Sequence, residues 1–139
     1  MNAPRISGLN HLTLAVSDLD RSIAFYCDLL GCRLRAQWIA GAYLEAGAFW
    51  LCLSLDYEIA PQTDYTHIAF DVDADSFAPL AEKIGLSAPI WKDNRSEGQS
   101  LYFLDPDGHK LELHVGTLRS RLDHCRANPG LGVAVSGCL

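Results

Sequence analysis

Hydrophobic and polar residues follow a regular order of patterns along the first half of the chain. The segment Asn10–Val16 alternates in the manner of a half-buried strand. Asp18–Ser22 offers residues that often begin helices, and apolar residues recur with helical spacing over Ser22–Leu30, up to Gly31. Strand-like segments follow at Arg33–Trp38, Ala42–Glu45 and Phe49–Leu55. The first half therefore predicts one strand, one helix and three further strands.

The second half repeats this order. Thr66–Val72 predicts a strand, and Ser76–Ile84 predicts a helix with Pro79 in its first turn. Three strands are then expected, the last two joined by the strong turn signal Asp105–Gly108. They lie at Ile90–Lys92, Ser100–Leu104 and Lys110–Val115. Both halves also open with the pattern histidine-apolar-x-apolar-x-valine, at His11–Val16 and His67–Val72.

This repetition predicts an α+β fold built from two βαβββ modules. The first module covers approximately residues 6–55, the second approximately residues 64–115, and Asp56–Asp64 joins them. A tail follows at residues 116–139, with a helix expected over Leu118–Arg126. The 139 residues are the length of one ordinary domain, so we expect both modules to belong to a single domain, 1–139.

Two histidines and one glutamate are candidate metal ligands. His11 and His67 occupy the same place in their modules, and Glu112 is a carboxylate in an apolar run, which is costly unless it is paired or binds a metal. If the modules pack symmetrically, the three side chains form a set that holds a divalent first-row metal and leaves positions open for substrate. The pattern alone also fits structural histidines, and His114 is a rival ligand that we rank below Glu112. Cys52 lies roughly where Glu112 lies in its module, and we interpret it as a small buried hydrophobic residue.

Charge and composition narrow the classes of partner. The formal net charge is −6, so nucleic acid is not expected, and an anionic substrate would need a local cluster of cations. The N-terminal residues lack the apolar run of a signal peptide, and no segment approaches the ~20 apolar residues of a membrane span. The five cysteines are odd in number and contain no C-x-x-C pair. We therefore expect no disulfide framework and a cytoplasmic location.

Several short motifs carry a family resemblance. They are GLNHLTLAV at Gly8–Val16, YLEAG at Tyr43–Gly47, WLCLS at Trp50–Ser54, DYTH at Asp64–His67, WKDNRSEG at Trp91–Gly98, YFLDPDGHKLE at Tyr102–Glu112 and LRSRL at Leu118–Leu122. In these motifs the chain resembles the vicinal-oxygen-chelate superfamily, which includes glyoxalase I, extradiol dioxygenases and bleomycin-binding proteins. It is most similar to the FosA-type fosfomycin-resistance thiol transferases. The resemblance extends from Ile6 to Arg126.

The resemblance implies an enzyme that adds glutathione to the oxirane ring of fosfomycin, with Mn²⁺ or another divalent metal and K⁺ as cofactors. It also implies a homodimer whose chains exchange modules, so that each metal site draws His11 from one chain and the other ligands from its partner. The implied metal ligands are His11, His67 and Glu112. The implied phosphonate contacts are Thr13, Lys92, Ser96, Tyr102 and Arg121, with Trp50 near the oxirane and Tyr43 near the thiol. Thr13, Tyr43 and Arg121 are the implied catalytic residues. The implied potassium loop consists of Asn94, Ser96, Glu97, Gly98 and Ser100.

Other functions of the same superfamily remain as alternatives. Dioxygenase or glyoxalase chemistry would not require the cationic phosphonate set. Epoxide hydrolysis would require a carboxylate beside the pocket, and Gly41 and Ala42 offer none, although Glu45 lies nearby in sequence. A drug-sequestering protein similar to the bleomycin binders would not need the three metal ligands.

Overall fold

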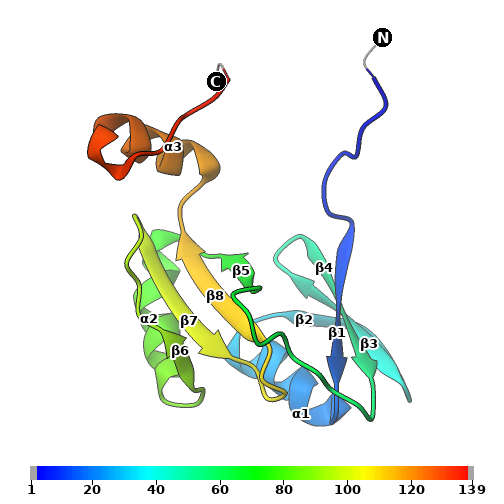
Figure 1. Cartoon of the computed structure of the whole chain (residues 1–139). Coiled ribbons are helices and arrows are strands. Elements are labelled where there is room, and N and C mark those ends of the chain that lie inside the picture. Colours follow the sequence, from blue (N-terminus) through cyan, green and yellow to red (C-terminus); the bar gives the residue numbers. More distant parts are fainter. Residues whose placement is uncertain (1–2, 138–139) are drawn as a thin grey trace. The chain divides into compact units, whose positions relative to one another are not determined.

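The computed structural model describes residues 3–137, and the chain separates into two compact units. The first unit contains the described residues up to Pro61 together with the turn Asp105–Gly108. The second contains Gln62–Leu104 and the described residues from His109 onward. Each unit contains a four-stranded sheet (Figure 1), and the order of the elements confirms the predicted pair of βαβββ modules. That the two modules form one domain stays a prediction.

The first unit contains the sheet β1-β4-β3-β2, in which β1 and β4 run parallel and the other neighbours antiparallel. Asp18 caps the helix α1 by accepting a hydrogen bond from the main-chain N–H of Arg21 at 3.0 Å. The elements are β1 His11–Val16, α1 Leu19–Ala24, the π-helix η1 Phe25–Leu29, β2 Arg33–Trp38, β3 Gly41–Ala46 and β4 Phe49–Leu55. The single helix expected up to Leu30 is therefore an α-helix that continues as a π-turn.

The core of the first unit lies on one face of its sheet. Alternate residues of β1, β3 and β4 are fully or almost fully buried there, and α1 packs against β3 and β4. These residues are Leu14, Val16, Ala42, Leu44, Leu51 and Leu53. Tyr26 of η1 is fully buried, and its hydroxyl donates a hydrogen bond to Asp105 Oδ2 at 2.7 Å. The turn that contains Asp105 therefore belongs structurally to the first unit, although it connects two strands of the second.

The second unit contains the sheet β5-β8-β7-β6, again with the outer pair β5 and β8 parallel. Figure 1 shows α2 along one face of this sheet and α3 beyond the end of β8. The elements are β5 Ile68–Asp71, α2 Ala74–Gly85, β6 Ile90–Lys92, β7 Gln99–Leu104, β8 Lys110–Val115, α3 Leu118–Ala127 and the short 3-10 helix η2 Pro129–Leu131. Among the described residues, no helix has both the length and the apolar character needed to cross a membrane.

The second module differs from the prediction in the bounds of β5, which begins only at Ile68 and so leaves out His67, and in those of α2. The helix α2 begins at Ala74 because the Asp73 side chain accepts a hydrogen bond from the main-chain N–H of Ser76 and caps the helix. Pro79 therefore lies inside the helix and not in its first turn, where it was expected. Proline has no N–H, so this position cannot donate to the carbonyl of Asp75, and the capped first turn and the packing of Ile84 hold the helix despite that loss.

Candidate active site

Polar side chains line one face of the second sheet. Across β7 and β8, Tyr102 pairs with Glu112 and Ser100 pairs with His114, so these four side chains point to the same face. Glu112 retains only 7% of its exposed surface, and it lies between the buried residues Leu111 and Leu113. The predicted sharing of a face by Glu112 and His114 is therefore correct. A carboxylate buried to this extent needs partners, and the structure provides them.

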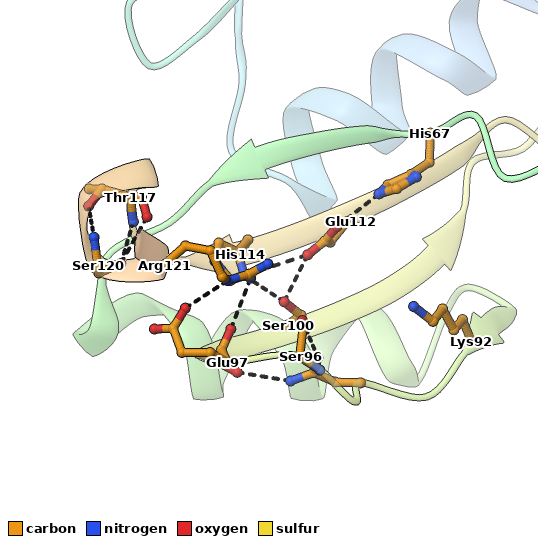
Figure 2. A network of polar contacts seen from close by, with 12 residues as sticks. His67, Lys92, Ser96, Glu97, Ser100, Glu112, His114, Thr117, Ser120 and Arg121 are labelled. Carbon is orange, nitrogen blue, oxygen red and sulfur yellow. Dashed lines mark hydrogen bonds and ion pairs between the residues drawn. The ribbon is translucent and has the colours of Figure 1, made fainter. Parts of the chain in front are cut away.

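His67 is the first partner of Glu112. It lies just before β5, and its Nε2 is 3.0 Å from Glu112 Oε1, while its Nδ1 is 2.8 Å from the main-chain carbonyl of Tyr65 (Figure 2). A carbonyl only accepts hydrogen bonds, so Nδ1 carries the proton that points at it. In a neutral ring, Nε2 then has a lone pair directed at a carboxylate oxygen. This arrangement is stable only if the ring is protonated or a cation lies between the two atoms, so the pair fits a divalent metal.

Ser100 and His114 hold the other oxygen of Glu112. The Ser100 hydroxyl donates to Glu112 Oε2 at 2.8 Å, and its oxygen is 2.6 Å from His114 Nδ1. Since the hydroxyl proton is directed at the carboxylate, Nδ1 of His114 is the donor in the second contact. His114 therefore acts in this unit as a support for Ser100, which is consistent with ranking it below Glu112 as a ligand. Figure 2 shows this chain of contacts along β8.

A cation lies beside the same pair. Lys92 of β6 pairs in register with Tyr102, which pairs in turn with Glu112, so the three residues form a row across the sheet. The Lys92 Nζ is 4.7 Å from the centre of the Tyr102 ring. Its hydrogen bond to the Tyr65 hydroxyl and the nearby Glu112 raise the pKa of Lys92, so the side chain is an ammonium at neutral pH.

The loop between β6 and β7 closes on itself through hydrogen bonds. Asn94 is its centre, because its side chain donates to the carbonyl of Gly98 at 2.9 Å and accepts from both the main-chain N–H and the hydroxyl of Ser96 at 3.0 Å. Gly98 has a positive φ of 86°, and an added Cβ would be 2.7 Å from the carbonyl oxygen of Val115. Only glycine therefore fits this turn. The oxygen-rich loop is the segment predicted to hold potassium.

Arg121 of α3 is tied to this loop. Its Nε donates to Glu97 Oε2 at 2.9 Å and its Nη2 donates to the Glu97 carbonyl at 3.1 Å (Figure 2). The helix begins at Thr117, whose hydroxyl accepts from the main-chain N–H of Ser120 while Ser120 reciprocates. The sequence predicts Glu97 in the potassium loop and Arg121 at the phosphonate, but it does not predict their ion pair. Opposite charges 24 positions apart carry no local signal that could have shown it.

The remaining predicted residues lie together in the first unit. His11 and Thr13 of β1 pair with Trp50 and Cys52 of β4, and Tyr43 pairs with Cys52, so these side chains share one face. The ring centres of His11 and Trp50 are 4.4 Å apart, and those of Trp50 and Tyr43 are 5.3 Å apart. Unlike the face that holds the core, this face is exposed at His11, Thr13, Tyr43 and Trp50.

The predicted metal ligands are thus divided between the units. His67 and Glu112 meet in the second, whereas His11 belongs to the first and lies against Asn10 and Trp50. Within residues 3–137 no three histidine, cysteine or acidic side chains gather closely enough to hold a metal ion. The three-ligand set stays a prediction, because His11 belongs to a different unit from His67 and Glu112.

Two of the cysteines are poor candidates for a nucleophile. Burial raises the pKa of the Cys32 thiol to about 11, and burial followed by the nearby Asp28 raises the pKa of Cys27. Both thiols are therefore protonated at neutral pH. Cys27, Cys32, Cys52 and Cys125, which are the described cysteines, form no disulfides.

Comparisons with known proteins agree with this architecture. The family model described as Glyoxalase/Bleomycin resistance protein/Dioxygenase superfamily matches residues 8–113. The chain is 53% identical over 133 residues to glutathione transferase FosA of Serratia marcescens, covering 92% of this chain and 94% of that protein. It is 39% identical over 127 residues to metallothiol transferase FosB of Lysinibacillus sphaericus, with coverages of 86% and 89%.

Solved structures give the same result. Fosfomycin resistance protein FosX from Mesorhizobium loti superposes with a TM-score of 0.73 at 34% identity, covering 85% of this chain and 99% of that one. A mutant of FosX from Listeria monocytogenes, complexed with Mn(II) and 1S,2S-dihydroxypropylphosphonic acid, superposes with a TM-score of 0.77 at 30% identity, with coverages of 86% and 98%. The resemblance found in the motifs is therefore confirmed, and the chain belongs to the Glyoxalase/Bleomycin resistance protein/Dioxygenase superfamily and, within it, to the FosA-type transferases.

Proposed function

We propose that this protein is a metal-dependent transferase that adds glutathione to the oxirane ring of fosfomycin. The observation that carries the proposal is the contact of His67 with Glu112 at the end of the row that Lys92, Tyr102 and Glu112 form across the second sheet. A metal-binding pair next to an ammonium suits a small phosphonate, and the similarity to a glutathione transferase suggests the thiol. A reducing cytoplasm, where glutathione is a thiol, fits the free cysteines among the described residues.

We propose that His67 and Glu112 hold Mn²⁺ together with His11. When bound, the metal would act as a Lewis acid on the oxirane oxygen, where negative charge develops as the ring opens. Ser100 keeps one carboxylate oxygen of Glu112 in place through its 2.8 Å hydrogen bond, which leaves the other oxygen for the His67 side. The thiolate comes from the cosubstrate, so the enzyme needs no cysteine nucleophile.

The phosphonate would be bound by cations and hydroxyl groups. One carboxylate and neutral histidines leave a divalent metal with a single positive charge, which cannot balance a dianion alone. Lys92 and Arg121 would supply the remaining charge. Thr13, Ser96 and Tyr102 would orient the group, while Trp50 would cover the oxirane and Tyr43 would lie near the thiol. Thr13, Tyr43 and Arg121 remain the proposed catalytic residues.

We propose that Asn94, Ser96, Glu97, Gly98 and Ser100 bind K⁺. The proposal is supported by the oxygen atoms that the closed loop collects, since K⁺ takes carbonyl, hydroxyl and carboxylate oxygens. Because Glu97 forms an ion pair with Arg121, K⁺ bound in the loop would restrict the movement of the Arg121 side chain. Because this effect is indirect, removing K⁺ should reduce activity less than removing Mn²⁺.

We also propose a two-fold homodimer in which the first module of one chain supplies His11 to the second module of its partner. The exposed face of β1–β4 supports this, because Trp38, Tyr43 and Trp50 retain 44%, 40% and 39% of their surface. Such a row of exposed aromatic residues is unusual on a surface that nothing covers. Light scattering at micromolar concentration should give a dimer, and a fully active monomer would contradict the shared site.

Water addition is a second candidate reaction, suggested by the similarity to FosX bound to a dihydroxypropylphosphonate, which is the compound that hydration of fosfomycin would leave. That reaction needs a general base for the water. Glu45 of β3 lies 3.2 Å from Arg35 in an ion pair, and an added Cβ at Gly41 would be 2.6 Å from Trp38 Cζ2. Neither position offers a free carboxylate, which favours thiol addition.

One experiment separates these reactions. The purified protein is incubated with fosfomycin, Mn²⁺, K⁺ and each thiol of a panel, and the products are analysed by mass spectrometry. We expect the glutathione adduct, formed only when protein and metal are both present. A diol formed without thiol consumption would identify a hydrolase. The absence of both products would indicate a binding protein.

A further inference from the structure

Tyr65 lies next to His67 on the short segment that leads into β5. The segment is well anchored, because the Asp64 carboxylate accepts from the Thr66 main-chain N–H at 2.9 Å and the Lys110 ammonium donates to the carbonyls of Thr63 and Asp64. Tyr65 nevertheless keeps 56% of its surface exposed. A half-exposed tyrosine on a fixed segment contributes little to a core, so its polar contacts need another explanation.

The main chain of Tyr65 orients the His67 ring. Its carbonyl is 2.8 Å from His67 Nδ1, and the two rings lie edge to face with centres 4.9 Å apart. The contact keeps the proton on Nδ1 and turns Nε2 toward Glu112. A carbonyl that fixes the tautomer of a histidine in this way determines which nitrogen can face a metal.

The side chain of Tyr65 holds Lys92. Its hydroxyl is 2.5 Å from Lys92 Nζ, and the ammonium lies 4.7 Å from the centres of both the Tyr65 and the Tyr102 rings. The ammonium therefore lies close to both aromatic rings, and the Tyr65 hydroxyl is its hydrogen-bond acceptor. Without these contacts, the four-carbon stem of a half-buried lysine would sample more rotamers.

The β6–β7 bulge and Trp91 support the contact between Tyr65 and Lys92. The pairing of β6 with β7 is irregular between Ile90 and Lys92, and this bulge lets both Trp91 and Lys92 reach Tyr102. The Trp91 indole is fixed by its hydrogen bond to the carbonyl of Leu111 at 3.0 Å, and the Tyr65 ring lies against it with centres 5.8 Å apart. The tyrosine hydroxyl thus has a fixed support, and it keeps the ammonium in the row with Glu112.

We propose that Tyr65 is a positioning residue that serves both parts of the site. Its carbonyl sets the His67 tautomer, and its hydroxyl places the Lys92 ammonium where a phosphonate oxygen is to bind. The expected change in substrate binding rests on the proposed function, whereas the positioning of His67 and Lys92 by Tyr65 does not. Tyr65 would order the cation before the substrate arrives, so its loss would weaken substrate binding more than turnover.

The kinetic test uses the full-length protein loaded with Mn²⁺ and K⁺. Tyr65→Phe keeps the ring and the main-chain carbonyl and removes only the hydroxyl, so we expect the KM for fosfomycin to rise roughly tenfold, with kcat within about twofold. The matched control is Tyr57→Phe, since Tyr57 is 91% exposed and outside the site, and its KM should not change. In a Lys92→Met background, Tyr65→Phe should have no further effect, because the hydroxyl acts through Lys92. An unchanged KM in Tyr65→Phe, or an equal effect in both backgrounds, would overturn the role of the hydroxyl.

A second measurement does not depend on fosfomycin turnover. In metal-free protein labelled with ¹⁵N, we expect a slowly exchanging Lys92 ammonium signal that disappears in Tyr65→Phe, and a His67 ring with its proton on Nδ1 in both proteins. A His67 ring protonated only on Nε2 would contradict the role of the carbonyl. If the unmodified protein fails to consume glutathione but gives these spectra, the proposed function fails while the positioning role of Tyr65 stands.

Discussion

The two modules share one framework and differ in the side chains that it presents. In each, the outer parallel pair of strands brings the start of the module beside its end: β1 pairs with β4 and β5 pairs with β8. The registers place Thr13 opposite Cys52 and Ala69 opposite Glu112, and both partners pair with a tyrosine on the next strand, Tyr43 or Tyr102. Cys52 is therefore the counterpart of Glu112, as the sequence comparison predicted.

The neighbouring position differs in the same direction. His114 pairs with Ser100 in the second module, and Ser54 pairs with Gly41 in the first. The first module thus lacks both the carboxylate and the hydroxyl that supports it, and it presents aromatic side chains on that face. One backbone arrangement thus presents two different sets of side chains. We infer that the second module carries the polar half of the site and that the first contributes His11 and aromatic walls.

The largest effect is expected at the counterparts Glu112 and Cys52, of which only Glu112 should be needed for metal binding. Glu112→Gln keeps the shape of the side chain but removes its charge, so we expect Mn²⁺ affinity to fall by more than the ~10–100-fold that the loss of a supporting residue typically costs, and activity to fall with it. Cys52→Ala at the equivalent place should keep both. Isothermal titration with Mn²⁺ and circular dichroism would measure metal affinity and fold. Loss of metal binding in Cys52→Ala, or its retention in Glu112→Gln, would reverse our assignment of the modules.

Much of this framework could be predicted because local patterns determine it. The strands Arg33–Trp38, Phe49–Leu55, Ile90–Lys92 and Lys110–Val115 have the predicted bounds, since alternation and flanking turn residues mark them. The helix α2 begins before the predicted Ser76, because the Asp73 side chain caps it. The π-turn Phe25–Leu29 could not be predicted, because its extra residue has no local signature. The hydrogen bond of Tyr26 to Asp105, far away in sequence, could not be predicted either.

The sequence predicts the members of the site, and this stays a prediction, but it does not predict their contacts. The family motifs propose Lys92, Arg121 and Glu112 as site residues, and the strand period correctly places Glu112 and His114 on one face. The partners of these side chains depend on long-range geometry: Glu97 meets Arg121 and Tyr65 meets Lys92 only after the sheet and α3 have formed. Whether His11 joins the set depends on the relation between the modules, which no local pattern determines.

The cations of the second module provide the next test. We expect Lys92→Ala and Arg121→Ala each to lose about 2–5 kcal/mol of transition-state stabilisation. This loss corresponds to a decrease in kcat/KM for fosfomycin of roughly 30-fold to several thousand-fold. Mn²⁺ should still bind to both variants. Arg119→Ala is the matched control, because Arg119 lies exposed on the same helix as Arg121. Steady-state kinetics and a Mn²⁺ titration measure both effects. If both variants retain wild-type kinetics, the cations do not bind the phosphonate.

A smaller decrease in Mn²⁺ affinity is expected when the hydroxyl of Ser100 is removed. Its counterpart in the first module, Gly41, has no side chain. Ser100→Ala leaves Glu112 Oε2 without its 2.8 Å donor, so we expect Mn²⁺ affinity to fall by about 10–100-fold, with the fold unchanged. Ser87→Ala, an exposed serine in the loop after α2, should leave affinity as it is. The measurement is again a Mn²⁺ titration. An unchanged affinity in Ser100→Ala would mean that His67 and the metal orient the carboxylate without the hydroxyl.

The smallest effect concerns the polar pair buried in the first unit, which we expect to stabilise the fold and to leave the chemistry unchanged. Tyr26 is fully buried and donates to Asp105 at 2.7 Å, so Tyr26→Phe leaves a buried carboxylate with one donor fewer and should cost about 1–3 kcal/mol in the free energy of unfolding. Metal affinity and the KM for fosfomycin should stay as they are at 25 °C. Urea unfolding at pH 8 measures the loss, with Tyr57→Phe as the exposed control.

The pH dependence of this loss identifies its cause. Burial, followed by the charge of Asp105, raises the pKa of Tyr26 well above its ordinary value of about 10, so above pH ~10 the unfolded chain releases a proton that the folded protein retains. The stability of the unmodified protein should therefore fall as pH rises beyond 10, whereas Tyr26→Phe lacks this group. The difference between the two proteins should narrow between pH 8 and pH 10.5. A difference that stays constant would assign the loss to packing, and a loss of metal binding would make the first module's polar pair part of the site.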